Sequence, residues 1–242
     1  MSSPGYDDEV KEDSPWLYPL VILAITLILS GGVSYYYFGP SLSDFRGDTP
    51  EASARTTPIH MQIGSTNFVI PENFTQYPRA RRGGIRDSVA LYAMLPNLEP
   101  YSVRYDQYFF ENNVDNPVVY FQIEIARLPM SESERLELIY RERLEEGLGT
   151  EIDNGLMQHN FANDSGYDDQ ELFVATKEDG TTVVILCTEF SNMVPSPNCR
   201  REMDIGNDLI MSYRFKRHHL DQWQDIDRGL LGLVASFRVP SN

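Results

Sequence analysis

The sequence PVVYFQIEIAR, residues 117–127, is the clearest strand signal in the chain, because apolar and polar side chains alternate along it. Successive side chains of a strand point to opposite faces, so this alternation predicts a strand with one buried and one wet face. The expected buried face carries Val119, Phe121, Ile123 and Ile125, and the other face carries Tyr120, Gln122 and Glu124. Such a strand is typical of an antiparallel sheet with one solvated side.

Six further segments have the composition of strands, at 61–70, 87–95, 172–177, 181–190, 199–205 and 209–215. Asp179-Gly180 and Gly206-Asn207 are dipeptides typical of two-residue hairpin turns, and they separate the last four segments into two pairs. We therefore expect a mainly antiparallel sheet.

Two segments have helical periodicity. Ser131 and Glu134 form a capping-box pattern, which predicts a helix that Gly147 ends. A second helix is expected from about Leu220, and its single apolar stripe consists of Trp223, Ile226, Leu230, Leu233 and Phe237. Strands and helices in this order predict an α+β domain.

Residues 16–38, from Trp16 to Phe38, include no charged side chain, and aromatic residues stand at both ends. A helix of this length spans the roughly 30 Å hydrocarbon core of a bilayer. A cleaved secretory signal is the alternative, but the preceding residues are acidic and Tyr-Tyr-Tyr-Phe is a poor cleavage site. The segment therefore predicts a single membrane-spanning signal anchor.

This anchor divides the chain into four parts. We expect a disordered acidic tail at 1–15, the transmembrane helix at 16–38, a flexible Pro-, Ser- and Thr-rich tether at 39–60 and a folded domain at 61–242. The formal net charge is −16, which repels nucleic acid and anionic headgroups at long range. The expected partners are the lipid bilayer and a protein of the membrane or envelope.

The two cysteines, Cys187 and Cys199, follow an apolar run and a Pro-containing loop. Their spacing suits a disulfide that closes a hairpin, which requires an oxidising compartment. Two unpaired thiols are the alternative.

The orientation of the membrane span has opposing signals. One basic residue, Lys11, precedes the span and two, Arg46 and Arg55, follow it, which favours a cytoplasmic domain. A disulfide favours the opposite side of the membrane.

Four arginines surround Gly83-Gly84, and they are the candidate binding residues: Arg79, Arg81, Arg82 and Arg86. Guanidinium groups suit carboxylate or phosphate, and paired glycines let a ligand approach the backbone. The alternative is a solvated loop whose arginines pair with the domain's own surplus acids.

No signature of catalysis, metal binding or cofactor binding is present, whether nucleophile elbow, phosphate loop or H-E-x-x-H. Residues 163–169 resemble a calcium loop, but the spacing of oxygen donors fails after Gly166. The adjacent His218 and His219 point too far apart to chelate one metal, and His60 and His159 lack a visible partner. We therefore expect no catalytic residues, no metal and no cofactor.

Several short segments resemble a pattern of uncharacterised single-pass inner-membrane proteins of proteobacteria. They are FVIPEN (68–73), RRGG (81–84), LPNLEPYS (95–102), CRR (199–201) and YRF (213–215). The resemblance implies a bacterial envelope location and assigns no activity. The FVIP segment and the closing ASFR (235–238) also resemble the Mog1/PsbP-like α/β/α sandwich.

These observations predict an inner-membrane protein with a periplasmic domain that docks a partner rather than transforming a substrate. One alternative is an anchored envelope hydrolase or transferase, with a titratable pocket around His159 and the loop 164–169. Another is an accessory subunit whose domain faces the cytoplasm.

Overall fold

The computed structural model describes residues 16–38, 46–128 and 130–240, and the chain divides into compact units on either side of the Arg46–Gly47 boundary. In the first unit, α1 (Leu17–Phe38) is a 22-residue helix, which is about 33 Å long at about 1.5 Å per residue. Its segment Tyr18–Tyr37 has a mean hydropathy of 1.8. Among the described residues α1 alone is long and apolar enough to cross a membrane, so the predicted apolar helix is confirmed. The predicted acidic tail, 1–15, lies outside the described residues.

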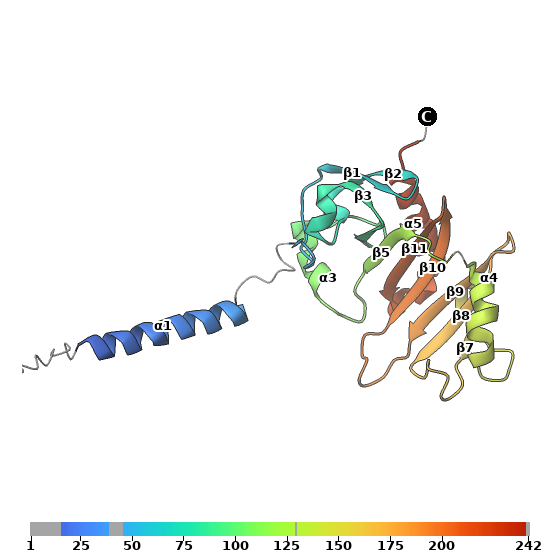
Figure 1. Ribbon diagram of the computed structural model, residues 1–242. Coiled ribbons are helices and arrows are strands. Elements are labelled where there is room, and N and C mark those ends of the chain that lie inside the picture. Colours follow the sequence, from blue (N-terminus) through green and yellow to red (C-terminus); the bar gives the residue numbers. More distant parts are fainter. Residues whose placement is uncertain (1–15, 39–45, 129, 241–242) are drawn as a thin grey trace, which may run out of the picture. The chain divides into compact units, whose positions relative to one another are not determined.

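The second unit is built on an eight-stranded antiparallel sheet in the order β4-β5-β11-β10-β9-β8-β7-β6 (Figure 1). A smaller sheet, β2-β1-β3, pairs β1 antiparallel with β2 and parallel with β3. The strands are β1 (Pro58–Ile63), β2 (Thr66–Pro71), β3 (Gly84–Arg86), β4 (Ser88–Met94), β5 (Val118–Ile125), β6 (Thr150–Ile152), β7 (Leu156–Asn160), β8 (Gln170–Thr176), β9 (Thr182–Thr188), β10 (Asn198–Gly206) and β11 (Leu209–Lys216). The α+β class is confirmed.

The main core lies on the inner face of the large sheet, where α5 (Trp223–Phe237) packs. The predicted stripe of α5 is confirmed, with Trp223 and Leu230 buried and Leu233 half-buried against the same core. Phe121 of β5 and Tyr213 of β11 are among the side chains that point toward it. The inner face is therefore the apolar face that the alternation of residues 117–127 predicts.

Helices of the described residues cover the outer face of the same sheet near its two ends. At one end α3 (Asp106–Phe110) packs Phe109 against Tyr92 of β4 and Val118 of β5. At the other end, α4 (Glu132–Arg135) and the π-helical turn Leu136–Tyr140 cover β8 and β9, as Figure 1 shows for α4. Between these helices, over β5, β11 and β10, the outer face has a hollow that residues of these strands and of the segment 76–80 line.

The central helix is shorter than predicted. The capping box of Ser131 and Glu134 is present, but α4 passes into the π-helical turn and the 3-10 turn Arg141–Arg143, and Leu144 is already extended. Leu144 forms a bridge with Phe161, and Ala162 N donates to Arg143 O at 2.8 Å. Backbone pairing with residues 161–162, directly after β7, therefore ends the helix before Gly147.

Residues 47–57, which we call the strap, pack on the domain although the sequence places them in the tether. Glu51 N donates to Gln76 O and Glu72 N donates to Thr57 O, both at 2.9 Å. The Ser53 hydroxyl donates to the Glu72 carboxylate at 2.6 Å. The compact unit therefore begins at Gly47 rather than Met61, because backbone pairing holds a segment that has few large apolar side chains.

Candidate functional site

The middle of the outer face carries a row of aromatic and basic side chains from neighbouring strands. Tyr92 of β4 pairs with Tyr120 of β5, Tyr120 with Arg214 of β11, and Arg214 with Arg200 of β10. Side chains at paired positions of a sheet stand beside each other on one face. The register therefore brings together residues that are far apart in the sequence.

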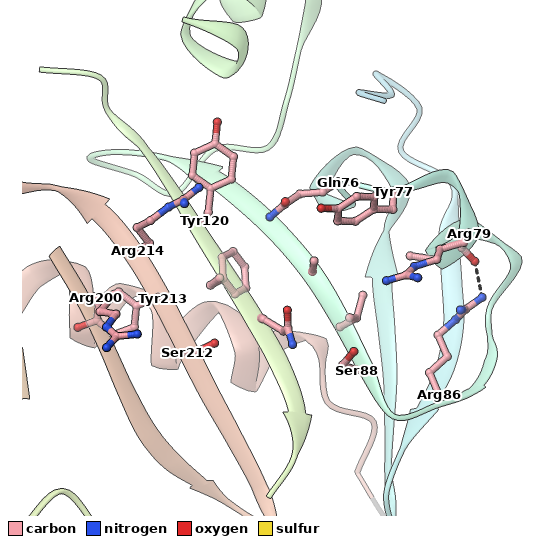
Figure 2. A pocket seen from close by; sticks show the side chains of 15 residues that line it. Gln76, Tyr77, Arg79, Arg86, Ser88, Tyr120, Arg200, Ser212, Tyr213 and Arg214 are labelled. Carbon is pink, nitrogen blue, oxygen red and sulfur yellow. Dashed lines mark hydrogen bonds between the residues drawn. The ribbon is translucent and has the colours of Figure 1, made fainter. Parts of the chain in front are cut away.

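A cavity of about 430 Å³ lies over this row, and we call it the arginine groove. Its polar lining includes Gln76, Arg79, Arg86, Tyr120, Arg200 and Arg214. Figure 2 shows Arg79 and Arg86 at one end, with Arg200, Arg214 and Tyr120 at the other. Of the described residues that line the groove, none is an Asp or a Glu, although the chain has 36 acidic residues against 20 Lys and Arg.

Arg200 and Arg214 place like charges directly opposite each other. Such cross-strand pairs are destabilising. Within the described ranges, neither arginine has a carboxylate at ion-pair distance. The Arg214 guanidinium instead lies 5.2 Å from the centre of the Tyr120 ring, a cation–π distance. The two groups are thus available to an external anion.

Burial raises the pKa of the phenol groups in the row. Burial raises the pKa of Tyr120, and the charge of the nearby Arg214 opposes this shift. It also raises the pKa of Tyr92, against the charge of Arg81. Both phenols therefore stay protonated at neutral pH, and the Tyr120 hydroxyl donates to Phe109 O at 3.2 Å.

A second hollow of about 280 Å³ adjoins the groove, and we call it the aromatic compartment. Tyr92, Phe109, Phe110 and Tyr120 line it, together with residues 50–52 of the strap. The rings of Tyr92 and Phe109 pack edge to face at 4.8 Å, while Phe110 is 64% exposed. The compartment therefore presents an accessible apolar surface next to the basic one.

The structure separates the four predicted binding arginines. Arg79 and Arg86 line the groove, and Arg79 also pairs with Asp48 of the strap at 2.8 Å. Arg81 lies outside the groove lining and contacts the Thr75 hydroxyl at 3.2 Å and the Glu51 carboxylate at 3.4 Å. Arg82 is exposed and is also outside the groove lining. Their role in binding stays a prediction.

Gly83 has a structural explanation within the fold. Its φ is +64°, and a Cβ there would lie 2.5 Å from the carbonyl oxygen of His60. Glycine accommodates both the left-handed backbone and the close approach. The need for glycine at this position therefore comes from the chain itself, without reference to a ligand.

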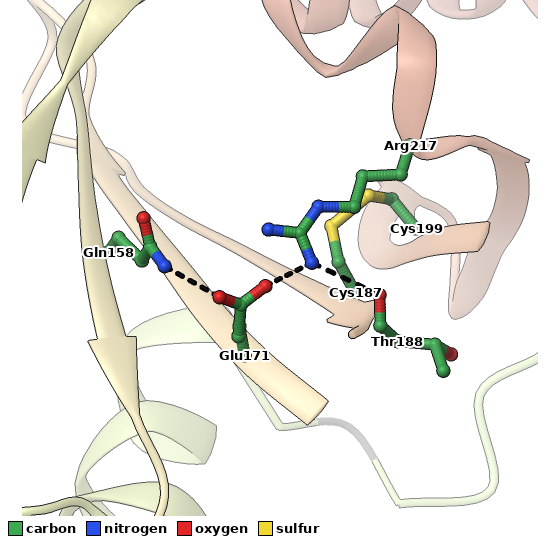
Figure 3. Close-up of a disulfide and its surroundings, with 6 residues drawn as sticks. All are labelled: Gln158, Glu171, Cys187, Thr188, Cys199 and Arg217. Atoms are coloured by element: carbon green, nitrogen blue, oxygen red, sulfur yellow. Dashed lines mark hydrogen bonds and ion pairs between the residues drawn. A yellow bond between two sulfur atoms is a disulfide. The ribbon is translucent and has the colours of Figure 1, made fainter. Parts of the chain in front are cut away.

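The predicted disulfide is present. Cys187 of β9 and Cys199 of β10 are paired across adjacent strands and bonded through sulfur, and both are fully buried. Beside them, Arg217 reaches the Glu171 carboxylate and the Thr188 carbonyl oxygen, and Gln158 donates to Glu171 at 2.6 Å (Figure 3). The bridge and this ion pair tie one end of β8, β9 and β10 to the residues after β11.

The predicted alternative sites are not brought together. His159 lies beside a hollow of about 290 Å³ lined by residues 145–150 and 158–160, and the loop 164–169 is not part of that lining. His219 contacts the carbonyl oxygens of Asp115 and Asn116, each at 3.2 Å. Among the described residues, no three His, Cys, Asp or Glu side chains are arranged to hold a metal ion.

No protein-family model matches the sequence, and no curated protein matches it. The fold is similar to that of Smlt3025, an immunity protein of the Stenotrophomonas maltophilia type IV secretion system. That similarity has a TM-score of 0.56 at 16% identity and covers 77% of this chain and 95% of Smlt3025. The iron-regulated outer membrane lipoprotein FrpD of Neisseria meningitidis has a TM-score of 0.48 at 14% identity, over 78% of this chain and 96% of FrpD. At 16% identity, the similarity to Smlt3025 shows a shared fold.

Proposed function

We propose that the protein is a single-pass inner-membrane protein whose domain docks a protein partner on the periplasmic side. The arginine groove is the proposed contact surface. One observation carries this proposal: Arg200 and Arg214 face each other in the groove without a carboxylate partner among the described residues, in a chain with a net charge of −16. An acidic surface of the partner would relieve this repulsion and supply charge-assisted hydrogen bonds.

The location rests on α1 and on the disulfide. The helix has the length of a bilayer span, and a buried disulfide is typical of an oxidising compartment. Arg46 and Arg55 after the helix favour the opposite orientation. We give the disulfide more weight, because two arginines are a weak signal and a formed bridge requires oxidation.

The test reverses the charge of the groove. We expect the full-length Arg200→Glu/Arg214→Glu variant to lose the partner that crosslinks to the wild-type protein in native membranes, as measured by mass spectrometry. The matched control is Arg228→Glu, because Arg228 is exposed on α5, which packs on the other face of the sheet. Equal recovery of the crosslinked partner by both variants would contradict the proposal.

Single substitutions separate docking from folding. Arg200→Glu places opposite charges across from Arg214, so the variant should be at least as stable to heat as the wild type while losing the partner. A variant that unfolds at lower temperature would instead assign Arg200 a structural role.

A second candidate function is protection against a secreted toxic protein, and its support is the fold shared with Smlt3025. It uses the same docking mechanism with a specific class of partner. Cells that lack the protein should then survive less well beside a secretion-competent competitor. Equal survival of both strains would remove this candidate.

A further inference from the structure

The arginine groove and the aromatic compartment share walls. Gln76, Tyr77, Tyr120 and Arg214 line both hollows, so a ligand that enters one lies against the other. Tyr120 presents its ring toward both, and Arg214 stacks on that ring. The two hollows therefore form one surface with a basic part and an apolar part.

The register sets the length of this surface. Arg200, Arg214, Tyr120 and Tyr92 stand on four neighbouring strands, and three inter-strand spacings of about 4.8 Å amount to about 14 Å. An extended polypeptide rises about 3.3 Å per residue, so about four residues cover this distance. A short segment can thus reach from the arginine pair to the compartment.

The arrangement of charges favours separate carboxylates over one phosphate. The guanidinium groups of the groove come from the segment before β3, from β3, from β10 and from β11, and they are spread along the hollow (Figure 2). Each guanidinium suits the fork geometry of a carboxylate. The exposed ring of Phe110 and the buried rings beside it suit an apolar side chain rather than a charged one.

We infer that the ligand is an extended segment of a protein, with acidic residues that contact Arg200 and Arg214 and an apolar or aromatic residue three to five positions away in the compartment. This inference rests on the proposed docking function and names the chemistry of the partner. Charge complementarity selects the acidic part, and the adjoining compartment selects the apolar part.

The test selects ligands from random peptides of about twelve residues displayed on phage, which exceed the roughly 14 Å span at about 3.3 Å per residue. The target is the full chain in lipid nanodiscs. We expect enriched peptides to combine an Asp or Glu pair with Phe, Leu, Ile or Met at the stated spacing. The Arg200→Glu/Arg214→Glu variant should bind them at least about tenfold more weakly, since each charge-assisted pair is lost. Arg228→Glu should bind them as the wild type does.

The Phe110→Ser variant tests the aromatic compartment separately from the arginine groove. In this variant the selected peptides should keep their acidic residues and lose the apolar preference. Enrichment without acidic residues, enrichment without the apolar residue in the wild type, or no enrichment at all would overturn the inference. Binding of dextran sulfate or phosphatidylglycerol vesicles in place of peptides would overturn it too, and would make the groove a site for another polyanion.

The two proposals fail differently. If no peptide of this class is enriched but the groove variant still loses its crosslinked partner, the segment inference is wrong and the docking function stands. If the crosslinked partner is also unaffected, both are wrong.

Discussion

At the scale of single residues, the most deeply buried charge of the domain holds three elements together. The Arg201 guanidinium on β10 pairs with Glu132 of α4 at 2.7 Å and with Asp227 of α5, and its side chain is 2% exposed. Lys177 also reaches Asp227, at 2.7 Å. The network connects the helix on the outer face with the helix on the inner face through the sheet.

Removal of this arginine should be costly. Arg201→Met leaves two buried carboxylates without their shared partner, a change that typically costs roughly 3–5 kcal/mol of unfolding free energy. Urea unfolding of the domain measures it. Arg228→Met on the exposed side of α5 is the control and should change the free energy by less than about 0.5 kcal/mol. Similar values for both variants would show that the network does not contribute as described.

His159 predicts a pH dependence of stability. Burial and the charge of Arg141 lower the pKa of the imidazole below its usual 6.5. The unfolded chain therefore binds the proton more readily, so this contribution is complete above about pH 6.5 and is lost as the pH falls through the folded pKa. We expect His159→Gln to lose less stability than the wild type between neutral pH and pH 5, measured by urea unfolding at each pH. Parallel pH profiles would contradict this assignment.

The groove could be predicted from the sequence only in part. Arg79 and Arg86 belong to a visible cluster, whereas Arg200 and Arg214 are single members of alternating strands, and nothing local distinguishes them from solvated side chains. The pairing of β10 with β11, and of β11 with β5, brings them together. The dipeptide Gly206-Asn207 was the available signal, but counting back from it places Arg200 opposite Tyr213. In the structure Asn207 and Asp208 form the turn, and a register shift between Asp204 and Gly206 brings Arg200 opposite Arg214.

At the scale of elements, strongly patterned segments were predictable and short ones were not. The alternation of 117–127 and the stripe of α5 reflect burial of one face, which the sequence encodes directly. The turns differ from the two predicted dipeptides, because residues 177–181 join β8 to β9 and residues 207–208 join β10 to β11. By contrast, β6 is three residues long and β7 five, with too few positions to show a period. The strap has no apolar pattern that could reveal it in the sequence. Hydrogen bonds from its backbone and polar side chains hold it to the domain instead.

The disulfide should stabilise the hairpin of β9 and β10 mainly because it restricts the conformations of the unfolded chain. It links residues 12 positions apart, for which the loop-entropy model gives about 3 kcal/mol. Cys187→Ala/Cys199→Ala should therefore unfold at lower urea concentration than the oxidised wild type. A reductant should shift the wild type and leave the double variant unchanged. No shift in either protein would show that the bridge contributes little.

At the scale of the whole molecule, the sequence predicts the membrane helix and the folded domain, and it leaves their orientation open. Composition predicts α1 as a membrane span because charge-free stretches of 22 residues are rare in soluble proteins. The orientation of that span depends on only three basic residues and two cysteines in the sequence. Residues 47–57 belong to the compact unit although composition assigns them to a tether, because composition does not reveal the hydrogen bonds of the strap.

Orientation has a direct test. If the proposed periplasmic location is correct, a reporter enzyme that is active only after export, fused after residue 242, should be active in cells. A second reporter that is active only in the cytoplasm should be inactive at the same position. The reverse result would assign the domain to the cytoplasm.

The strap has one more consequence, because it is the first part of the compact domain that the chain reaches after α1. A mechanical load applied through α1 would reach residues 47–57 before any strand, and it would act on hydrogen bonds such as that of Glu51 N with Gln76 O. Residues 50–52 also form a wall of the aromatic compartment, so peeling them away would dismantle that wall while the sheet stayed whole. A pull on the chain before residue 47 would thus act on the aromatic compartment through the strap itself.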